Sequence, residues 1–178
     1  MRSAVFLDRD GTIIDDVGFI SSIDDVVFFP YAVDALKLLQ KKHLFFIATN
    51  QSCVGLGKVS AKDAATVNDF VLAHLAKNGV RIEALYCCAH KRDDNCDCIK
   101  PKSLFPKKAQ LQFNLDLSKS YTVGDHPHDV DFGTGVGATG IYLLTGHGQK
   151  HHAQMPANAQ CFDNLMTAAQ WIDTRSTL

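Results

Sequence analysis

The sequence has no long hydrophobic run and almost no excess of either charge. No apolar stretch approaches the ~20 residues of a membrane-spanning helix, so we expect no membrane partner. Lysine and arginine number 18 against 19 aspartate and glutamate, a net charge of −1, which disfavours a protein held to nucleic acid by electrostatic attraction. An acidic residue comes as early as Asp8, too soon for the apolar region of a signal peptide, so we expect a cytoplasmic protein.

Internal repeats and low-complexity tracts are also missing, and the chain is short. Its 178 residues have a mass of 19.5 kDa, with 46% hydrophobic and 21% charged residues, which suffices for one sizeable core. We therefore expect a single domain over residues 1–178. Because neither a heptad pattern nor an obvious exposed apolar stripe is present, we expect a monomer.

Short apolar runs and helical patterns alternate along the chain. Strands are expected at residues 4–7, 44–48, 82–87, 121–123 and 140–144. Helices are expected from Pro30 onwards and at about 60–78, 103–113, 128–136 and 163–172, with loops at 11–29, 55–57, 88–99 and 146–156. This alternation predicts an α/β, Rossmann-like parallel sheet with helices on both faces, and such sheets bind ligands beyond the carboxyl ends of their strands.

Two carboxylates follow the first predicted strand directly. Asp8 and Asp10 are two positions apart, so on an extended segment both side chains project to the same side. Close carboxylates need a cation or a shared proton to coexist. Asp125 and Asp129, after the fourth strand, add further oxygen atoms, and such a set suits Mg²⁺. An isolated pair of this kind more often consists of an ordinary strand-end carboxylate and a turn residue. The prediction of a site therefore depends also on the polar residues that follow the other strands.

Four of the six cysteines fall within twelve residues. In a chain without a secretion signal such clustering indicates a metal before a disulfide. Cys88, His90, Cys96 and Cys98 match the four-coordinate ligand set of a structural Zn²⁺ site. We therefore predict a zinc-binding loop at about 88–99 that orders the segment before Lys100, and we interpret the remaining cysteines, Cys53, Cys87 and Cys161, as packing residues.

Four ordered motifs resemble those of the haloacid dehalogenase superfamily of phosphotransferases. They are residues 6–12 (FLDRDGT), Thr49-Asn50, Lys100-Pro101, and residues 123–125 (VGD) with Asp129. The resemblance implies that Asp8 is the nucleophile that forms an aspartyl-phosphate, and that Asp10 protonates the leaving oxygen and then activates water. It also implies a catalytic Mg²⁺ on Asp8, Asp10 and Asp125, with the backbone carbonyl of Arg9 as a further ligand.

The same resemblance assigns further residues to phosphate and substrate. Thr49 and Asn50 hold phosphoryl oxygens and Lys100 neutralises their charge, while Asp129 orients Lys100 or a metal-bound water. The remaining candidate substrate-binding residues lie in the loops around the site: Arg9, Asp16, Gly18, Phe19, Gln51, Ser52 and His126. His128 and the 146–152 stretch are interpreted as solvated.

The zinc loop, the Lys-Pro pair and the lack of a large cap domain resemble one branch of subfamily IIIA, the heptose bisphosphate and histidinol phosphatases. This implies Mg²⁺-dependent hydrolysis of a small sugar phosphate, a heptose 1,7-bisphosphate that loses its 7-phosphate in lipopolysaccharide precursor synthesis. The chain departs from the branch where cations or glycine are usual, at Cys53, Leu56, Ile99 and His126. These departures leave the phosphatase residues intact but weaken the expectation of a bisphosphate.

Other functions stay open at this stage. A histidinol-phosphate phosphatase is the alternative within the branch, with Phe19 as a candidate aromatic to stack on imidazole. Another small-molecule phosphatase, a zinc-stabilised binding protein without catalysis, and a polynucleotide-end phosphatase are further alternatives. The near-neutral charge disfavours the last of these.

Overall fold

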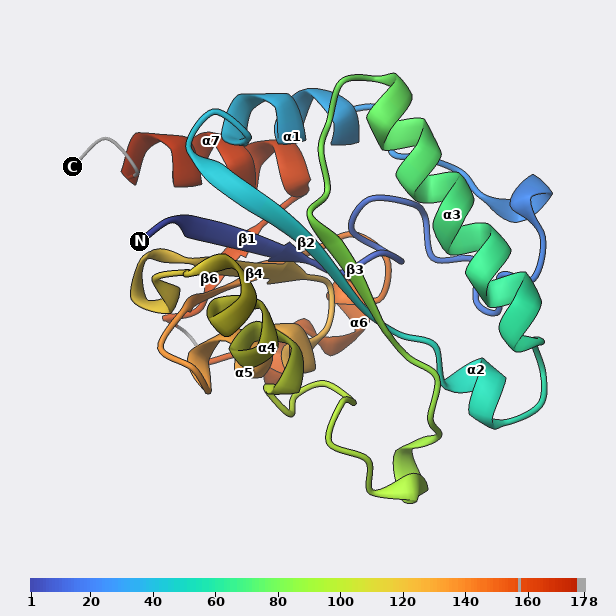
Figure 1. The fold of residues 1–178 in the computed structure, drawn as a ribbon. Helices are drawn as coiled ribbons and strands as arrows, with labels where there is room; N and C mark the ends of the chain where they lie inside the picture. Colours follow the sequence, from blue (N-terminus) through green and yellow to red (C-terminus); the bar gives the residue numbers. More distant parts are fainter. Residues whose placement is uncertain (157, 176–178) are drawn as a thin grey trace.

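The computed structural model describes residues 1–156 and 158–175, and its centre is a six-stranded parallel sheet (Figure 1). The strands are β1 (Ser3–Leu7), β2 (His43–Asn50), β3 (Ala84–Cys88), β4 (Tyr121–Gly124), β5 (Thr139–Leu143) and β6 (Gln160–Phe162). Their order in space is β3-β2-β1-β4-β5-β6, with every pair parallel. The α/β, Rossmann-like fold expected from the sequence is confirmed.

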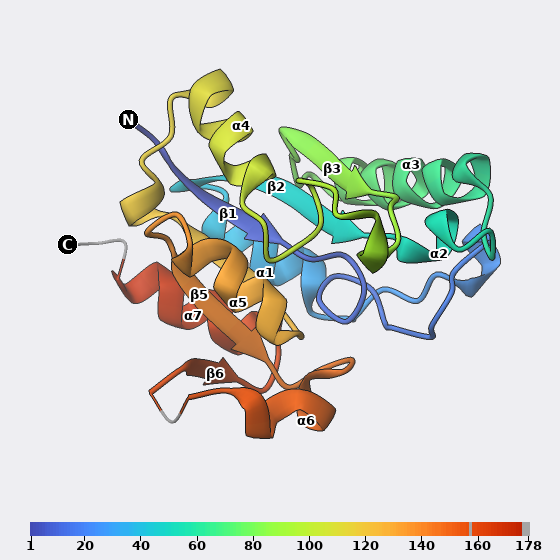
Figure 2. The same cartoon turned by 90° about the horizontal axis from the view of Figure 1, so that it is seen from below.

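Helices cover both faces of the sheet. They are α1 (Ala32–Leu39), α2 (Ser52–Gly55), α3 (Ala61–Lys77), α4 (Leu104–Phe113), α5 (Pro127–Thr134), α6 (Gly148–His151) and α7 (Leu165–Arg175). Short 3₁₀ turns occupy Ile23–Asp25, Arg92–Asp94, Leu117–Lys119 and His152–Gln154. Helices α1, α3 and α7 lie on one face, and α4 and α5 on the other (Figures 1 and 2).

Alternation along the central strands builds two cores. Val5 and Leu7 of β1 pack into the cluster under α1, α3 and α7, while Phe6 points to the opposite face. There the Phe6 ring stacks on Phe46 of β2 at 5.0 Å between centroids. Because strands covered on both faces bury every residue, β1 and β2 read as continuous apolar runs in the sequence.

The path of the chain determines where a ligand site forms. From β1 the chain moves to β2 and β3 on one side, and then returns to place β4 on the other side of β1. Such a reversal of strand order leaves a crevice at the carboxyl ends of the two strands. Asp8 follows β1 and Asp125 follows β4, so the crevice lies between these two carboxylates.

Several expected boundaries need correction. The segment expected as a loop at 146–156 contains the short helix α6, whose Gly148 carbonyl accepts a 2.7 Å hydrogen bond from the Tyr142 hydroxyl. Helix α2, which was not expected, ends at Gly55, where the expected loop at 55–57 begins. Strand β3 starts at Ala84 rather than Ile82, and no sequence pattern indicates β6. Helix α3 agrees well, because Ser60 caps its start and Asn78 follows its last residue.

No helix in the described part of the chain is long and apolar enough to cross a membrane. The described segments between strands also form no separate cap over the carboxyl edge of the sheet (Figure 2).

Candidate active site

A cavity of about 170 Å³ opens at the carboxyl ends of β1, β2 and β4. Its lining residues are polar or charged without exception: Asp8, Asp10, Asp16, Thr49, Asn50, Arg92, Lys100, Asp125, His126, His128, Asp129 and His147. Three elements that are distant in sequence therefore meet at one point, with five carboxylates among twelve side chains.

Lys100 is the cation at the bottom of this cavity. Its side chain is 4% exposed, and its Nζ lies 2.6 Å from Asp129 Oδ1 and 2.9 Å from Asp8 Oδ1. Burial disfavours the charged amine, but the carboxylates of Asp129 and Asp8 outweigh it and raise the Lys100 pKa above its ordinary value. Lys100 is thus held as a permanent cation beside Asp8, and Asp129 is the residue that holds it there.

Thr49 and Asn50 lie at the end of β2, and the side-chain oxygen of each already accepts a hydrogen bond from within the protein. The backbone N–H of Lys100 donates to Asn50 Oδ1 at 3.1 Å, which leaves the side-chain NH₂ of Asn50 to face the cavity. The Gln51 amide donates to Thr49 Oγ1 at 2.9 Å, so the hydroxyl proton of Thr49 can be given to another acceptor. Both side chains are thereby prepared as donors to an anion.

Asp10 takes part in a hydrogen-bonded network beneath the cavity. The guanidinium of Arg9 donates to both of its oxygens at 2.9 Å, and Gln51 Nε2 donates to Oδ2 at 2.7 Å. Burial raises the pKa of Asp10, although the charge of Arg9 opposes this. Such a carboxyl is suited to exchanging a proton.

The side chain and the backbone carbonyl of Arg9 both have hydrogen-bond partners within the protein. Its side chain is only 1% exposed and donates to Asp10 and to Asn68 Oδ1, so it supports Asp10 from below rather than binding substrate. Its backbone carbonyl, expected as a metal ligand, accepts from the N–H groups of Ile13 and Ile14. It is therefore committed to the turn after Asp10.

The carboxylate of Asp125 is in close contact with the backbone of two glycines. A Cβ on either Gly11 or Gly146 would overlap Asp125 Oδ2, and both glycines have positive φ angles, +74° and +51°. The backbone N–H of His147 donates to the same oxygen at 2.7 Å. Burial and the charges of Asp8 and Asp129 raise the pKa of Asp125 to about 8.

These carboxylates fit a divalent cation. Oxygen atoms of Asp8, Asp125 and Asp129 lie within 4.8 Å of one another, and a set of carboxylate oxygens this close together is typical of a divalent-cation site. Both oxygens of Asp129 are engaged, Oδ1 by Lys100 and Oδ2 by the N–H of His126. Both oxygens of Asp10 accept from Arg9. The hydrogen bonds and ion pairs of the described residues reach only Oδ1 of Asp8 and only Oδ2 of Asp125, so these two side chains are best placed to hold Mg²⁺. The side chain of Asp10, expected as a third ligand, is not in this group.

Cys88, His90, Cys96 and Cys98 converge as a second, separate group. The Cys88 and Cys98 sulfurs are 2.9 Å apart, each is 3.6 Å from the Cys96 sulfur, and His90 Nδ1 lies 3.2 Å from Cys98 Sγ. Tetrahedral Zn²⁺ places its sulfur ligands roughly 3.8 Å apart. The four soft donors fit zinc after a small expansion, and no open ligand position is left for water.

Of the residues predicted to bind substrate in the surrounding loops, some line the cavity and others lie outside it. Asp16 reaches it and contacts His147 Nδ1 at 3.1 Å, and Gly18 makes the following turn with φ +93°. Phe19 is 56% exposed with Lys58 Nζ 4.9 Å from its ring centre. The described residues that line the cavity do not include Phe19, Gln51 or Ser52. Gln51 lies behind the lining and donates hydrogen bonds to Asp10 and Thr49.

The mouth of the cavity contains residues that sequence reasoning missed. Arg92, in the zinc loop, has its Nη1 2.9 Å from His128 Nε2. His126 lines the cavity as expected, and His128 and His147, interpreted as solvated, line it as well. Burial lowers the pKa of His126 to about 4 and also lowers that of His128. No local sequence signal marks Arg92, because the folded zinc loop alone turns it toward the site.

Comparison with known proteins shows the family of this chain. Residues 97–168 match the HAD-hydrolase-like family model. The chain is 33% identical over 143 residues to D-glycero-β-D-manno-heptose-1,7-bisphosphate 7-phosphatase of Haemophilus influenzae, covering 76% of this chain and 78% of that protein. It is 30% identical to the enzyme of the same name from Neisseria meningitidis serogroup B, covering 97% and 96%. The chain belongs to the haloacid dehalogenase-like phosphatases.

Solved structures show the same relationship. The D,D-heptose 1,7-bisphosphate phosphatase of B. bronchiseptica, solved with magnesium and phosphate, superposes with a TM-score of 0.89 at 27% identity. The superposition covers 97% of this chain and 99% of that one. This haloacid dehalogenase-like phosphatase is accordingly a hydrolase of phosphate monoesters, which disfavours a catalytically silent binding protein.

Proposed function

We propose that this phosphatase removes the 7-phosphate of D-glycero-D-manno-heptose 1,7-bisphosphate, in heptose and lipopolysaccharide precursor synthesis. The observation that carries the proposal is the pairing of Asp8 with Lys100 at 2.9 Å in the crevice between β1 and β4. It is supported by relatives named for this substrate that are similar over nearly the whole chain. We further propose that residues 1–178 act as one domain, as a cytoplasmic monomer, on small molecules only.

In the first step a carboxylate oxygen of Asp8 attacks phosphorus and the bond from phosphorus to the sugar oxygen breaks. Asp10 gives its proton to the departing oxygen, which leaves as the sugar hydroxyl. Thr49 and Asn50 donate hydrogen bonds to the phosphoryl oxygens, and Lys100 supplies positive charge beside Asp8. Magnesium, held by Asp8 and Asp125, supplies further charge neutralisation when bound.

In the second step water removes the phosphoryl group from Asp8. Asp10, now deprotonated, takes a proton from water as its oxygen bonds to phosphorus, and the bond from phosphorus to the Asp8 oxygen breaks. Arg9 and Gln51 keep Asp10 in position for both transfers, because they donate to its oxygens from the buried side. The products are inorganic phosphate and the regenerated Asp8 carboxylate.

A second phosphate requires a cation near the mouth, and Arg92 is the best-placed candidate. Ile99, where the branch has arginine, is 7% exposed and packs into the core. Leu56 is exposed but outside the described lining, and His126 has a lowered pKa and is neutral at pH 7. Arg92 lines the cavity and has no carboxylate within ion-pair distance among the residues described.

Phosphate release across a substrate panel tests the function. The panel contains both anomers of heptose 1,7-bisphosphate, histidinol phosphate, common sugar monophosphates and a short 5′-phosphorylated oligonucleotide, with Mg²⁺ present and Asp8→Asn as the control. We expect one heptose anomer to be preferred and Asp8→Asn to be inactive. Preference for histidinol phosphate, or equal slow turnover of every ester, would contradict the heptose assignment.

Arg92→Gln tests recognition of the second phosphate. We expect KM for the bisphosphate to rise roughly tenfold, the loss of about one charged hydrogen bond, with kcat little changed. Arg81→Gln is the matched control, because Arg81 is paired with Glu83 on an exposed surface outside the cavity. A similar rise in KM for p-nitrophenyl phosphate, which carries one phosphate, would show that Arg92 acts on the reacting group instead.

A further inference from the structure

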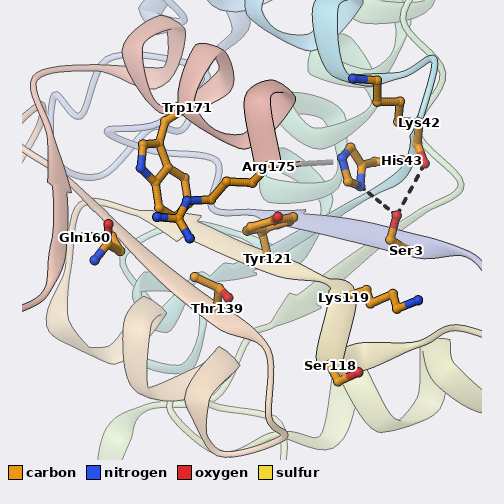
Figure 3. A pocket seen from close by; sticks show the side chains of 10 residues that line it. All are labelled: Ser3, Lys42, His43, Ser118, Lys119, Tyr121, Thr139, Gln160, Trp171 and Arg175. Atoms are coloured by element: carbon orange, nitrogen blue, oxygen red, sulfur yellow. Dashed lines mark hydrogen bonds between the residues drawn. The ribbon is translucent and has the colours of Figure 1, made fainter. Parts of the chain in front are cut away.

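A larger cavity, of about 600 Å³, lies at the opposite end of the sheet (Figure 3). The amino ends of five strands contribute to it, through Ser3 of β1, His43 of β2, Tyr121 of β4, Thr139 of β5 and Gln160 of β6. Trp171 and Arg175 of α7 form one wall, as Figure 3 shows. Its volume is in the range of small-molecule binding sites, and none of its lining residues is shared with the catalytic cavity.

The charge of this amino-end cleft is opposite to that of the catalytic cavity. Lys42, Lys119 and Arg175 line it, and none of the described lining residues is an aspartate or glutamate. Lys42 Nζ is 2.6 Å from Asp173 Oδ1, but Lys119 and Arg175 have no carboxylate within ion-pair distance in the described ranges. In a chain with a net charge of −1, such a concentration of cations favours an anionic ligand.

Flat rings supply the second feature of the cleft. The Arg175 guanidinium lies 4.2 Å from the centre of the Trp171 ring, and Trp171 meets Tyr121 edge to face at 6.5 Å. A guanidinium stacked on an indole presents its other face to a planar ligand. Thr139 and Gln160 add a hydroxyl and an amide on the side of this wall, while the hydroxyls of Ser3 and Ser118 lie on the other side of the cleft (Figure 3).

We propose that the amino-end cleft binds a nucleotide, whose base stacks on the Trp171–Arg175 wall and whose phosphates contact Lys119. His43 adds no charge at neutral pH, because burial lowers its pKa to about 4, and its Nδ1 is 2.8 Å from Ser3 Oγ. The ligand would therefore be held by fixed cations and stacking. This inference does not depend on which sugar phosphate is the substrate.

The chain contains one tryptophan, so its fluorescence reports on this cleft directly. We would titrate the full-length protein with ADP, adenosine and inorganic phosphate separately, without added Mg²⁺, and confirm binding by calorimetry. We expect saturable quenching by ADP, with adenosine and phosphate each binding at least about tenfold more weakly. Phosphate binding as tightly as ADP would overturn the assignment to a nucleotide.

Matched variants test whether ADP binds in the amino-end cleft. Lys119→Gln should weaken ADP binding about tenfold, whereas Lys107→Gln, on α4 outside the cleft, should leave it unchanged. Asp8→Asn should also leave it unchanged, because the catalytic cavity is separate. The proposal is overturned if fluorescence and calorimetry both show no saturable ADP binding at millimolar concentration. It is also overturned if Lys119→Gln has no effect or Asp8→Asn removes the binding.

Discussion

Gly11 and Gly146 show how single residues determine the position of a neighbouring carboxylate, that of Asp125. Both have positive φ angles, and both lack the Cβ that would occupy the space of Asp125 Oδ2. Only glycine satisfies both requirements, so two short turns, one after β1 and one after β5, bring their backbones against the same carboxylate. The position of Asp125 in the candidate metal site therefore depends on the lack of a Cβ at both glycines.

Gly146→Ala tests this close contact, and Gly137→Ala is its matched control. Gly137 has φ +80°, but a Cβ there meets nothing within 4 Å. Both variants should lose about 1 kcal/mol of stability through backbone strain, and Gly146→Ala should lose more, because its Cβ would also meet the backbone Cα of Gly11 at 2.7 Å. Only Gly146→Ala should also lose activity and weaken Mg²⁺ binding by roughly tenfold or more, measured by kinetics against Mg²⁺ concentration. Equal activity in the two variants would show that Asp125 has room to move.

At the scale of elements, the zinc loop connects β3 to the Lys-Pro segment before α4. Its four ligands bracket Arg92 and end two residues before Lys100, whose N–H must reach Asn50 at the end of β2. A bound metal would restrict the loop that holds both cations of the site. We therefore propose that this loop has a structural role and positions Lys100 and Arg92 for substrate.

Cys96→Ser should release zinc and lower activity even at saturating Mg²⁺, because Lys100 and Arg92 are then held less firmly. We expect metal analysis to give about one zinc per wild-type chain, since the four donors form one complete site, and less in the variant. Cys161→Ser is the control, since Cys161 is half-buried in β6 outside the cluster. Full activity of a zinc-free Cys96→Ser protein would contradict this role of the loop.

At the scale of the whole molecule, the carboxylates that line the candidate site affect the free energy of unfolding. Burial and the charges of Asp8 and Asp129 raise the pKa of Asp125 from an ordinary 3.8 to about 8. At a pH between these two pKa values, Asp125 keeps its proton in the folded protein but has released it in the unfolded chain. Asp125 therefore stabilises the metal-free protein less as the pH rises from about 4 to about 8. The pKa values of His43 and His126, lowered from 6.5 to about 4, act in the opposite sense below that range, so the free energy of unfolding should fall between about pH 6.5 and about pH 8.

Magnesium should reverse this loss, since it binds the deprotonated carboxylates. We expect Mg²⁺ at about 100 times its Kd to raise Tm by roughly 5–10 °C at pH 8.5, and by much less at pH 5.5. Asp125→Asn should raise the Tm of the metal-free protein at pH 8.5 and remove the Mg²⁺ effect. Thermal unfolding at both pH values checks this, and a Mg²⁺ shift that is larger at pH 5.5 would contradict it.

Much of this architecture could be predicted from local sequence patterns. Apolar runs that end in Asp8, Asn50 and Asp125 indicate buried parallel strands, and the position of Ser60 indicates the start of α3. The carboxyl ends of such strands meet at one edge of a sheet, so the polar residues that follow them are expected to lie together. The spacing of the cysteines likewise indicates the zinc ligands.

Elements without a local pattern could not be predicted in this way. Strand β6 has three half-buried residues and forms because β5 offers it a free edge, while α6 depends on the bond from Tyr142 to Gly148. Short segments of this kind obtain most of their stability from tertiary contacts, which leave no periodic signal in the sequence.

The sequence by itself determined the candidate chemistry of this phosphatase, because Asp8, Asp10, Lys100 and Asp125 stand in ordered motifs that resemble those of the family. Only the tertiary structure decided the role of Arg9, whose guanidinium is buried under Asp10, and the arrival of Arg92 at the mouth of the cavity. The physical reason is that side-chain direction and loop path depend on contacts between distant segments. Neighbours in the chain determine which element forms, and packing determines which way its side chains face.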